Sequence, residues 1–96
     1  MVWALFNDFT DRNLTKKVLT STKLRQRLVT NIMYYVDSYE LDGVNIDFEY
    51  ISKDIIDDYL QFLRELSVEC RKNKIVLSID NYAPSEWMVI LTGNSN

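Results

Sequence analysis

The chain has 96 residues, of which 47% are hydrophobic and 12% aromatic, a composition typical of one globular domain rather than a disordered segment. Its net charge of −3 is mixed along the chain and no apolar run is long enough to cross a bilayer, which argues against a nucleic-acid interface or a membrane span. Histidine is absent and Cys70 is the single cysteine, which excludes a Ser-His-Asp triad, a histidine metal site and an internal disulfide.

The first half of the chain predicts one strand and one helix. The apolar run at residues 2–6 is typical of a strand that is covered on both faces. Residues 9–20 are mixed and polar, and we expect a loop there with at most one helical turn. Ser21 or Thr22 can cap a helix that ends near Glu40. Its apolar face comprises residues at three- and four-residue spacing: Leu24, Leu28, Ile32, Tyr35, Val36 and Tyr39.

A second strand is predicted at residues 41–50, followed by a helix that Ser52 caps and that has Asp54 in its first turn. The apolar stripe of this helix comprises Ile55, Ile56, Tyr59, Leu63, Leu66 and Cys70. Its position in the stripe makes Cys70 a buried apolar side chain rather than a nucleophile.

Residues 75–80 predict a third strand, Pro84 marks a loop beyond it, and residues 92–96 are expected to fray. A helix thus occupies each connection between strands, which is typical of parallel strands in right-handed βαβ units. We therefore predict an α/β fold with three parallel strands and two main helices in a single unit over residues 1–96.

The second strand carries two kinds of side chain on its two faces. The apolar set suits packing beneath the helices: Val44, Ile46 and Phe48. The other set is a polar row: Asn45, Asp47 and Glu49. Same-face neighbours on a strand lie about 6.6 Å apart. Two acids at that separation in a low dielectric resist double ionisation, so one tends to keep the proton that a general acid needs.

Each polar residue has a predicted role. Glu49 lies nearest the carboxyl end of the strand, where parallel α/β folds open to their ligands, and it is the predicted proton donor. Asp47, one step deeper, can share that proton or orient a substrate group, and Asn45 can donate a hydrogen bond to Asp47. Asp42 and Gly43 precede the strand, and we expect a turn in which Gly43 adopts an unusual backbone conformation.

Other interpretations of these residues stay open. The polar row could face solvent on an edge strand, although a strand between two helices is seldom solvated. It could also be a magnesium or calcium site at Asp47 and Glu49, although such sites usually use more ligands. Tyr82, just past the third strand, could stack on a ligand, while packing is the commoner role for a loop tyrosine. Trp3 and Tyr50 are expected in the core.

The same strand resembles a known signature. Residues 42–49, Asp-Gly-Val-Asn-Ile-Asp-Phe-Glu, resemble the Asp-Gly-x-Asp-x-Asp-x-Glu motif of glycoside hydrolase family 18, the chitinase-like hydrolases, with Asn45 in place of an Asp. With Leu41 and Tyr50, the strand looks most similar to the bacterial branch related to spore-cortex-lytic enzymes that act on peptidoglycan. Three further segments resemble that branch: residues 2–5, 61–66 and 77–84.

The resemblance implies a TIM (β/α)8 barrel, of which this chain carries a parallel βαβαβ segment, about the third to the fifth βα units. It also implies retaining hydrolysis of N-acetylglucosamine-containing glycans, of chitin or peptidoglycan type, without a metal or organic cofactor. Glu49 would protonate the glycosidic oxygen, and Asp47 would orient the acetamido group whose carbonyl attacks the anomeric carbon. Asn45 and Tyr82 would contact the substrate.

A full barrel takes about 250 residues, so we expect a truncated reading frame or an excised piece that is inactive alone. Its inward sheet face would be bare, and a homo-oligomer that buries this face is the expected route if the chain folds by itself. The family suggests the cell envelope, the spore or secretion, although no signal peptide is recognisable. Two alternatives are a non-catalytic carbohydrate-binding or assembly module, and a small α/β domain that binds a metal at Asp47 and Glu49.

Overall fold

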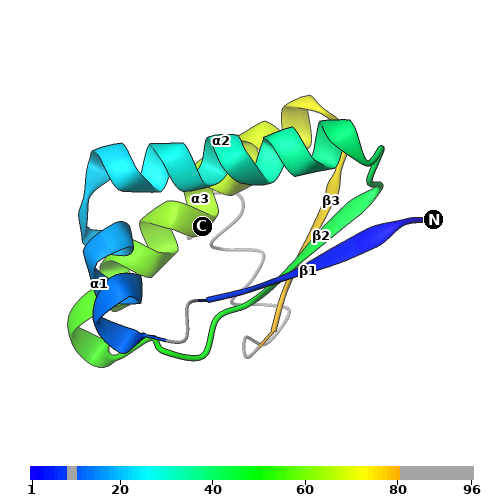
Figure 1. Ribbon diagram of the computed structural model, residues 1–96. Helices are drawn as coiled ribbons and strands as arrows, with labels where there is room; N and C mark the ends of the chain where they lie inside the picture. The colour runs from blue at the N-terminus through cyan, green and yellow to red at the C-terminus, as the bar shows by residue number, and fades with distance from the viewer. Residues whose placement is uncertain (9–10, 81–96) are drawn as a thin grey trace, which may run out of the picture.

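A computed structural model of the protein describes residues 1–8 and 11–80, which form a three-stranded parallel sheet with its helices on one face (Figure 1). The elements in chain order are β1 (Trp3–Asn7), α1 (Arg12–Thr20), α2 (Thr22–Ser38), β2 (Gly43–Asp47), the short 3-10 helix η1 (Lys53–Ile55), α3 (Ile56–Lys72) and β3 (Val76–Ile79). The strand order is β1-β2-β3, and the predicted α/β arrangement is confirmed. None of the described helices is long and apolar enough to span a membrane.

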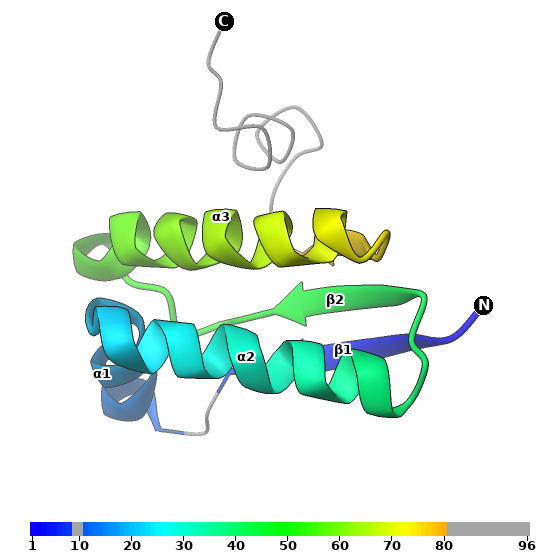
Figure 2. The ribbon, with the colours of Figure 1, turned by 90° about the horizontal axis from the view of Figure 1, so that it is seen from above.

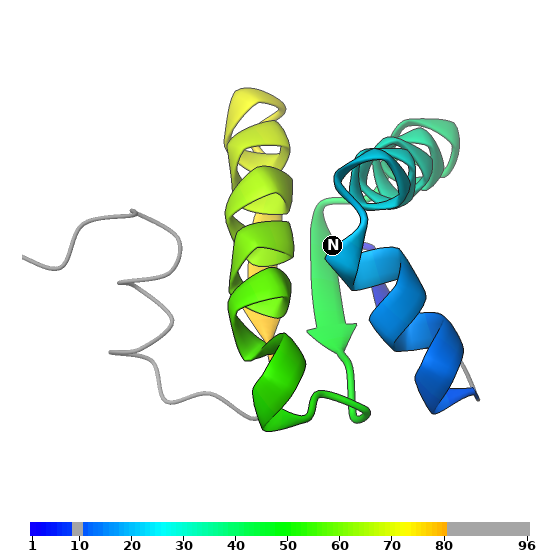
Figure 3. The same ribbon diagram turned by 90° about the vertical axis from the view of Figure 1, so that its left-hand side faces the viewer.

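The core lies between the sheet and the helices α2 and α3. Seen from above, α2 and α3 lie side by side with β2 between and below them (Figure 2). A view from the side shows β3 behind α3, and β1 on the side of α1 and α2 (Figure 3). Phe48 stacks on Phe62 and on Tyr59 of α3, with ring centroids 5.5 Å and 5.8 Å apart. The apolar stripe predicted for the second helix is thus confirmed, and it includes Cys70, which is only 1% exposed.

Residues 12–20 form a regular helix, so the loop predicted there is wrong. Asp11 caps α1, because its carboxylate accepts a hydrogen bond from the backbone N–H of Asn13. The buried face of α1 contains Thr15 and Leu19, both fully buried. A threonine in the apolar stripe weakens the periodic signal, which explains why sequence patterning missed this helix.

The cap of α2 follows the prediction, whereas part of its predicted buried face does not. Ser21 accepts a hydrogen bond from the backbone N–H of Leu24 and so caps the helix. Tyr35 and Tyr39 are 49% and 66% exposed and stack on each other, with ring centroids 5.8 Å apart. The Tyr35 ring also contacts Phe6 of β1 edge-on, with ring centroids 6.2 Å apart, so these two tyrosines lie at the rim of the apolar face rather than within the core. The side chains of α2 that are buried are Arg25, Val29, Ile32 and Val36.

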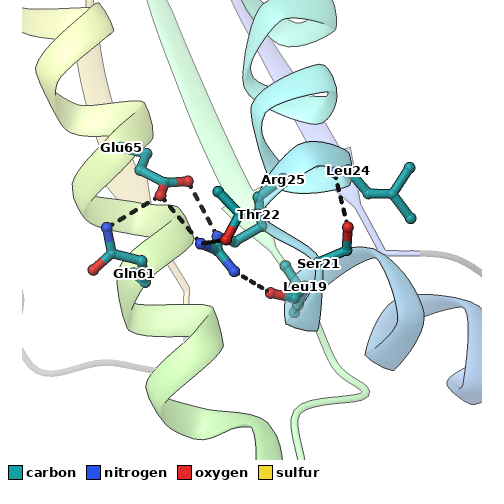
Figure 4. A network of polar contacts seen from close by, with 7 residues as sticks. All are labelled: Leu19, Ser21, Thr22, Leu24, Arg25, Gln61 and Glu65. Carbon is teal, nitrogen blue, oxygen red and sulfur yellow. Dashed lines mark hydrogen bonds and ion pairs between the residues drawn. The ribbon is translucent and has the colours of Figure 1, made fainter.

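Arg25 joins all three helices although it carries a charge (Figure 4). Its guanidinium donates to the carbonyl oxygen of Leu19 at 2.8 Å, to the Thr22 hydroxyl at 3.2 Å, and to the Glu65 carboxylate at 3.2 and 3.4 Å. Gln61, one turn before Glu65 on α3, donates to the same carboxylate at 3.1 Å. A buried cation needs such partners, and these contacts fix α2 against α3 and the end of α1.

The unusual backbone angle expected at Gly43 occurs at two other residues instead. Positive φ values occur at Glu40 (51°) and Lys74 (57°), one residue beyond the caps of α2 and α3, and not at Gly43. After each of these residues the next backbone N–H bonds back into the helix, from Leu41 to Val36 and from Ile75 to Cys70. Both helices therefore end in the same left-handed turn without a glycine.

The second strand is shorter than predicted, and the helix after it begins differently. β2 ends at Asp47, and Phe48 to Tyr50 continue beyond the sheet ladder. Ser52 makes no capping bond to the backbone; its hydroxyl donates to the Asp54 carboxylate instead, so the predicted cap is wrong. The predicted loop at Pro84 and the tail at residues 92–96 lie outside the described residues.

One face of the sheet is left open by the described part of the chain. On β1 the helix-facing Ala4 and Phe6 are half-buried, whereas Trp3 and Leu5 are 42% and 57% exposed. The prediction that both faces of β1 are covered, with Trp3 in the core, is therefore wrong for these residues. Val76 on β3 is likewise 44% exposed on this open face.

Candidate functional site

The open face of the sheet changes from apolar to polar along the strands. Near the amino ends, the three side-by-side positions are Trp3, Gly43 and Val76. Near the carboxyl ends, β1 and β2 pair through Asn7 and Asp47. Polar groups therefore gather at the edge where parallel α/β sheets bind their ligands.

Asn45 lies in the middle of this face, but it does not bond to Asp47 as predicted. Its side-chain oxygen accepts a hydrogen bond from the Ser78 hydroxyl at 2.7 Å, and its nitrogen donates to the Asp80 carboxylate at 3.5 Å. The reason is distance, because the position beside Asn45 on β3 is Ser78, and adjacent strands lie about 4.8 Å apart, closer than same-face neighbours along one strand.

Ser78 and Asp80 are site residues that sequence reasoning missed. They alternate with Leu77 and Ile79 on β3 and just after it, and those two apolar side chains are buried on the helix side. The same alternation that identified the polar row on β2 was therefore present on β3. It extends the polar surface from one strand to two.

Asp47 lies on the open face at the last position of β2 and is half-buried. Within residues 1–8 and 11–80, no hydrogen-bond donor or cation contacts its carboxylate. A half-buried carboxylate without a partner in this part of the chain can accept a hydrogen bond from a bound molecule.

Glu49 is exposed and lies two residues beyond the end of β2, whereas the prediction placed it within the strand. The alternation nevertheless continues past the ladder, because Phe48 is buried against α3 and its neighbour points outward. Glu49 is one of the residues that line a small pocket at the carboxyl end of the sheet. Its other lining residues are Arg12, Tyr50, Ile51 and Ser52.

Arg12 and Tyr50 give this pocket a cation beside an aromatic ring. The Arg12 guanidinium lies over the Tyr50 ring, 5.6 Å from its centroid, which is a favourable cation–π geometry. Tyr50 is half-buried at the pocket rather than in the core as predicted. The pocket thus presents a carboxylate, a guanidinium and a ring to a ligand.

Asp8 is a third residue that sequence reasoning missed. It follows β1 directly, and its two carboxylate oxygens accept hydrogen bonds from the backbone N–H groups of Glu49 and Tyr50 at 3.0 and 2.7 Å. From the sequence alone, an acid after an apolar strand indicates only a turn. The contact links residues more than 40 positions apart, so no local pattern could reveal it.

The described residues contain no group of three or more acidic or cysteine side chains placed to hold a metal ion. Tyr82, predicted to contact a sugar, lies outside the described residues. What the described site can do chemically is to donate and accept protons and hydrogen bonds through carboxyl groups.

Comparison with known proteins gives the site its context. The model of the family "Glycosyl hydrolases family 18" matches residues 10–91. Among solved structures, the chain is similar to ydhD of Bacillus subtilis, described as a sporulation-specific glycosylase, with 31% identity and a TM-score of 0.77 over 80% of this chain. It is similar in fold to the spore cortex-lytic enzyme SleL of Bacillus megaterium QM B1551, with 14% identity and a TM-score of 0.74 over 80% of this chain. No curated protein matches.

The chain spans 27% of the length of the first of these structures and 19% of the second. Its three parallel strands and their helices therefore correspond to one segment of a family 18 barrel, as the signature at residues 42–49 implied. Since the family model covers most of the sequence, the chain belongs to glycosyl hydrolases family 18.

Proposed function

We propose that this chain carries the proton donor and the acetamido-orienting acid of a glycoside hydrolase that cleaves N-acetylglucosamine-containing glycans, of chitin or peptidoglycan type. One observation carries the proposal. Asp47 and Glu49 present two carboxylates, one half-buried and one exposed, in succession at the carboxyl end of the central strand. Neither carboxylate has a partner within the described part of the chain, so both are available to a substrate.

The reaction would use these acids in different roles. Glu49, at the outer position, donates its proton to the glycosidic oxygen as the bond to the anomeric carbon breaks. The carbonyl oxygen of the substrate's own acetamido group attacks the same carbon from the opposite face, while Asp47 accepts a hydrogen bond from the acetamido N–H. Water then opens the cyclic intermediate, returns a proton to Glu49, and leaves the anomeric configuration retained.

The position of Asp47 supports these different roles for the two acids. Asp47 is the last residue of β2 and Glu49 follows it by two residues in the same segment, so Asp47 lies on the same side as Glu49 and cannot approach the anomeric carbon from the opposite face. A substrate-derived nucleophile removes the need for a second acid across the cleft. Asn45, held by Ser78, forms the polar floor beneath Asp47.

Hydrolysis of a chromogenic N-acetylglucosamine oligosaccharide tests the role of Glu49. The wild-type chain is compared with Glu49→Gln, which removes the proton and keeps the size of the side chain. Glu40→Gln is the matched control, because Glu40 is an exposed acid at the end of α2. We expect any turnover to vanish with Glu49→Gln and to persist with Glu40→Gln. Equal rates for wild type and Glu49→Gln would remove Glu49 from its role.

Binding of the same oligosaccharide is measured independently of turnover, by amide chemical shifts in NMR. The expected shifts lie at Asn45, Asp47 and the pocket residues, and Asp47→Asn should weaken binding of the N-acetylated sugar more than that of the matching sugar without the acetyl group. A separate pocket lies between α2 and α3 and is lined by Gln26, Val29, Thr30, Glu65, Val68 and Glu69. Shift changes confined to that pocket would contradict the proposed position.

A further inference from the structure

The backbone that carries Glu49 is held by an acid from the neighbouring strand. β1 ends at Asn7, and the next residue, Asp8, extends its carboxylate to the segment that follows β2. One oxygen, Oδ1, accepts the N–H of Glu49 at 3.0 Å, and the other, Oδ2, accepts the N–H of Tyr50 at 2.7 Å. The contact therefore ties together the carboxyl ends of two strands at the candidate site.

The two hydrogen bonds to the Asp8 carboxylate lie beyond the end of the backbone hydrogen-bond ladder between β1 and β2. The parallel pairing of β1 with β2 stops at Asn7 and Asp47, so the N–H groups of Glu49 and Tyr50 lie beyond it. A carboxylate is the side chain that suits these two donors, because each of its oxygens can accept one N–H in a charge-assisted bond. An amide offers only one oxygen, and its NH2 group would face the second N–H.

A second contact fixes the residue just before Glu49. Phe48 is 5% exposed and stacks on Phe62 and Tyr59 of α3. The residue before Glu49 is therefore held by the packing of its ring against α3. The backbone N–H groups of Glu49 and of Tyr50 are both held by the Asp8 carboxylate. Although its side chain is exposed, the backbone from which the side chain projects is restrained on both sides.

We propose that Asp8 is a positioning residue that fixes the direction in which the Glu49 side chain projects into the pocket; this role rests on the proposed function of Glu49 as the proton donor. A general acid acts only when its proton is within hydrogen-bond reach of the leaving oxygen. An exposed glutamate on a free loop would sample many directions, and holding its backbone reduces that range. Asp8 contacts the backbone rather than the substrate, so it acts through Glu49.

The chain contains a matched control for this contact. At the opposite end of the same two strands, the Asp42 carboxylate accepts a hydrogen bond from the backbone N–H of Val2 at 2.8 Å. Asp42 and Asp8 are thus two acids that each bond a carboxylate to the backbone of the partner strand. Only the Asp8 bonds lie beside the candidate acid.

The test uses the full chain and NMR of four variants: Asp8→Asn, Asp8→Ala, Asp8→Glu and Asp42→Asn. We expect Asp8→Asn and Asp8→Ala to raise the hydrogen-exchange rates of the Glu49 and Tyr50 amides by about tenfold or more, while amides in α2 and α3 keep theirs. The couplings that report the χ1 angle of Glu49 should move to rotamer-averaged values in the same two variants. Asp8→Glu keeps both oxygens and should restore part of each effect, and Asp42→Asn should change neither.

The outcomes separate the two proposals. Unchanged exchange at Glu49 and Tyr50 and an unchanged χ1 of Glu49 in Asp8→Asn would overturn the positioning role. An equal loss of protection across the whole sheet would also overturn it, because Asp8 would then be only a general structural residue. If Glu49→Gln hydrolyses the oligosaccharide as wild type does, the proposed function fails, whereas the exchange and χ1 results still decide whether Asp8 holds the Glu49 backbone.

Discussion

The indole ring of Trp3 lies directly over Gly43 on the open face of the sheet. A Cβ atom added at Gly43 would come within 2.5 Å of Cδ2 of this ring, which is closer than any real Cβ contact. The two residues are register partners on β1 and β2, so the close approach follows from the strand pairing. Gly43 is therefore needed for space beneath the ring rather than for its backbone conformation.

Gly43→Ala is expected to destabilise the chain by about 1–2 kcal/mol, since the ring must be displaced from its position over β2. The loss in the free energy of unfolding is limited to this range because Trp3 is partly exposed and its ring can tilt outward. Urea unfolding followed by circular dichroism measures the change. In the background of Trp3→Leu the same substitution should cost much less; equal costs in both backgrounds would show that the ring is not the cause.

Removal of the buried guanidinium at Arg25 should be one of the more damaging single changes. The Arg25 side chain is 9% exposed and that of Glu65 is 24% exposed. Arg25→Ala leaves the Glu65 carboxylate without its cation and the Leu19 carbonyl without the guanidinium that donates to it, and we expect a loss of about 3 kcal/mol in the free energy of unfolding. Glu65→Gln keeps one acceptor on a less buried side chain and should cost about 1 kcal/mol.

The control for this prediction is Arg27→Ala, which removes an exposed arginine from the same helix. Its unfolding midpoint in urea should stay close to that of the wild type. A loss for Arg25→Ala no greater than that for Arg27→Ala would contradict the structural role assigned to the network.

Cys70 should behave as an inert thiol until the chain unfolds. Its burial raises the pKa of the thiol from the usual 9.0 to about 11, and the nearby negative charge of Glu69 adds to the increase. The folded state keeps the thiol neutral, whereas the unfolded state ionises above pH 9. The stabilising contribution is therefore complete below pH 9 and is lost as the pH rises towards about 11.

Comparison of wild type with Cys70→Ala between pH 8 and about 11 tests this linkage. We expect the free energy of unfolding of the variant to fall less steeply with pH over that range, because the thiol is the only ionisable group that differs between the two proteins. A thiol reagent should modify the wild type no faster than it unfolds. Parallel pH curves for the two proteins would contradict the prediction.

Lys74→Gly is expected to stabilise the chain. Lys74 has a φ of 57° one residue beyond the cap of α3, a conformation that glycine adopts without the steric cost that a Cβ atom imposes. We expect a gain of about 0.5–1 kcal/mol in urea unfolding, less the entropy that glycine adds to the unfolded chain. Lys74→Ala separates the backbone effect from the lost charge, since it removes the charge and keeps the Cβ. An equal gain in the free energy of unfolding for Lys74→Ala would show that loss of the lysine charge, and not relief of the backbone conformation, causes the stabilisation.

Local patterns in the sequence were sufficient for the three parallel strands and for the two longer helices, although not for α1. Apolar runs with helical spacing between them predicted parallel strands joined by helices, and the polar row from Asn45 to Glu49 identified the candidate site. These features depend on periods of two and of about 3.6 residues, which a chain expresses within a few turns or strand positions. The family signature at residues 42–49 includes the same polar row, so the predicted fold and the predicted family rest on the same part of the chain.

Only the tertiary structure decided which of these residues meet. Asn45 bonds to Ser78 and Asp80 on β3, and Asp8 holds the backbone of Glu49, because strand register brings together positions 33 to 42 residues apart. Register depends on the packing of the whole sheet and its helices, and no short window of sequence contains it. The sequence by itself thus determined which residue types line the site, whereas the pairing of strands determined their partners and how firmly Glu49 is held.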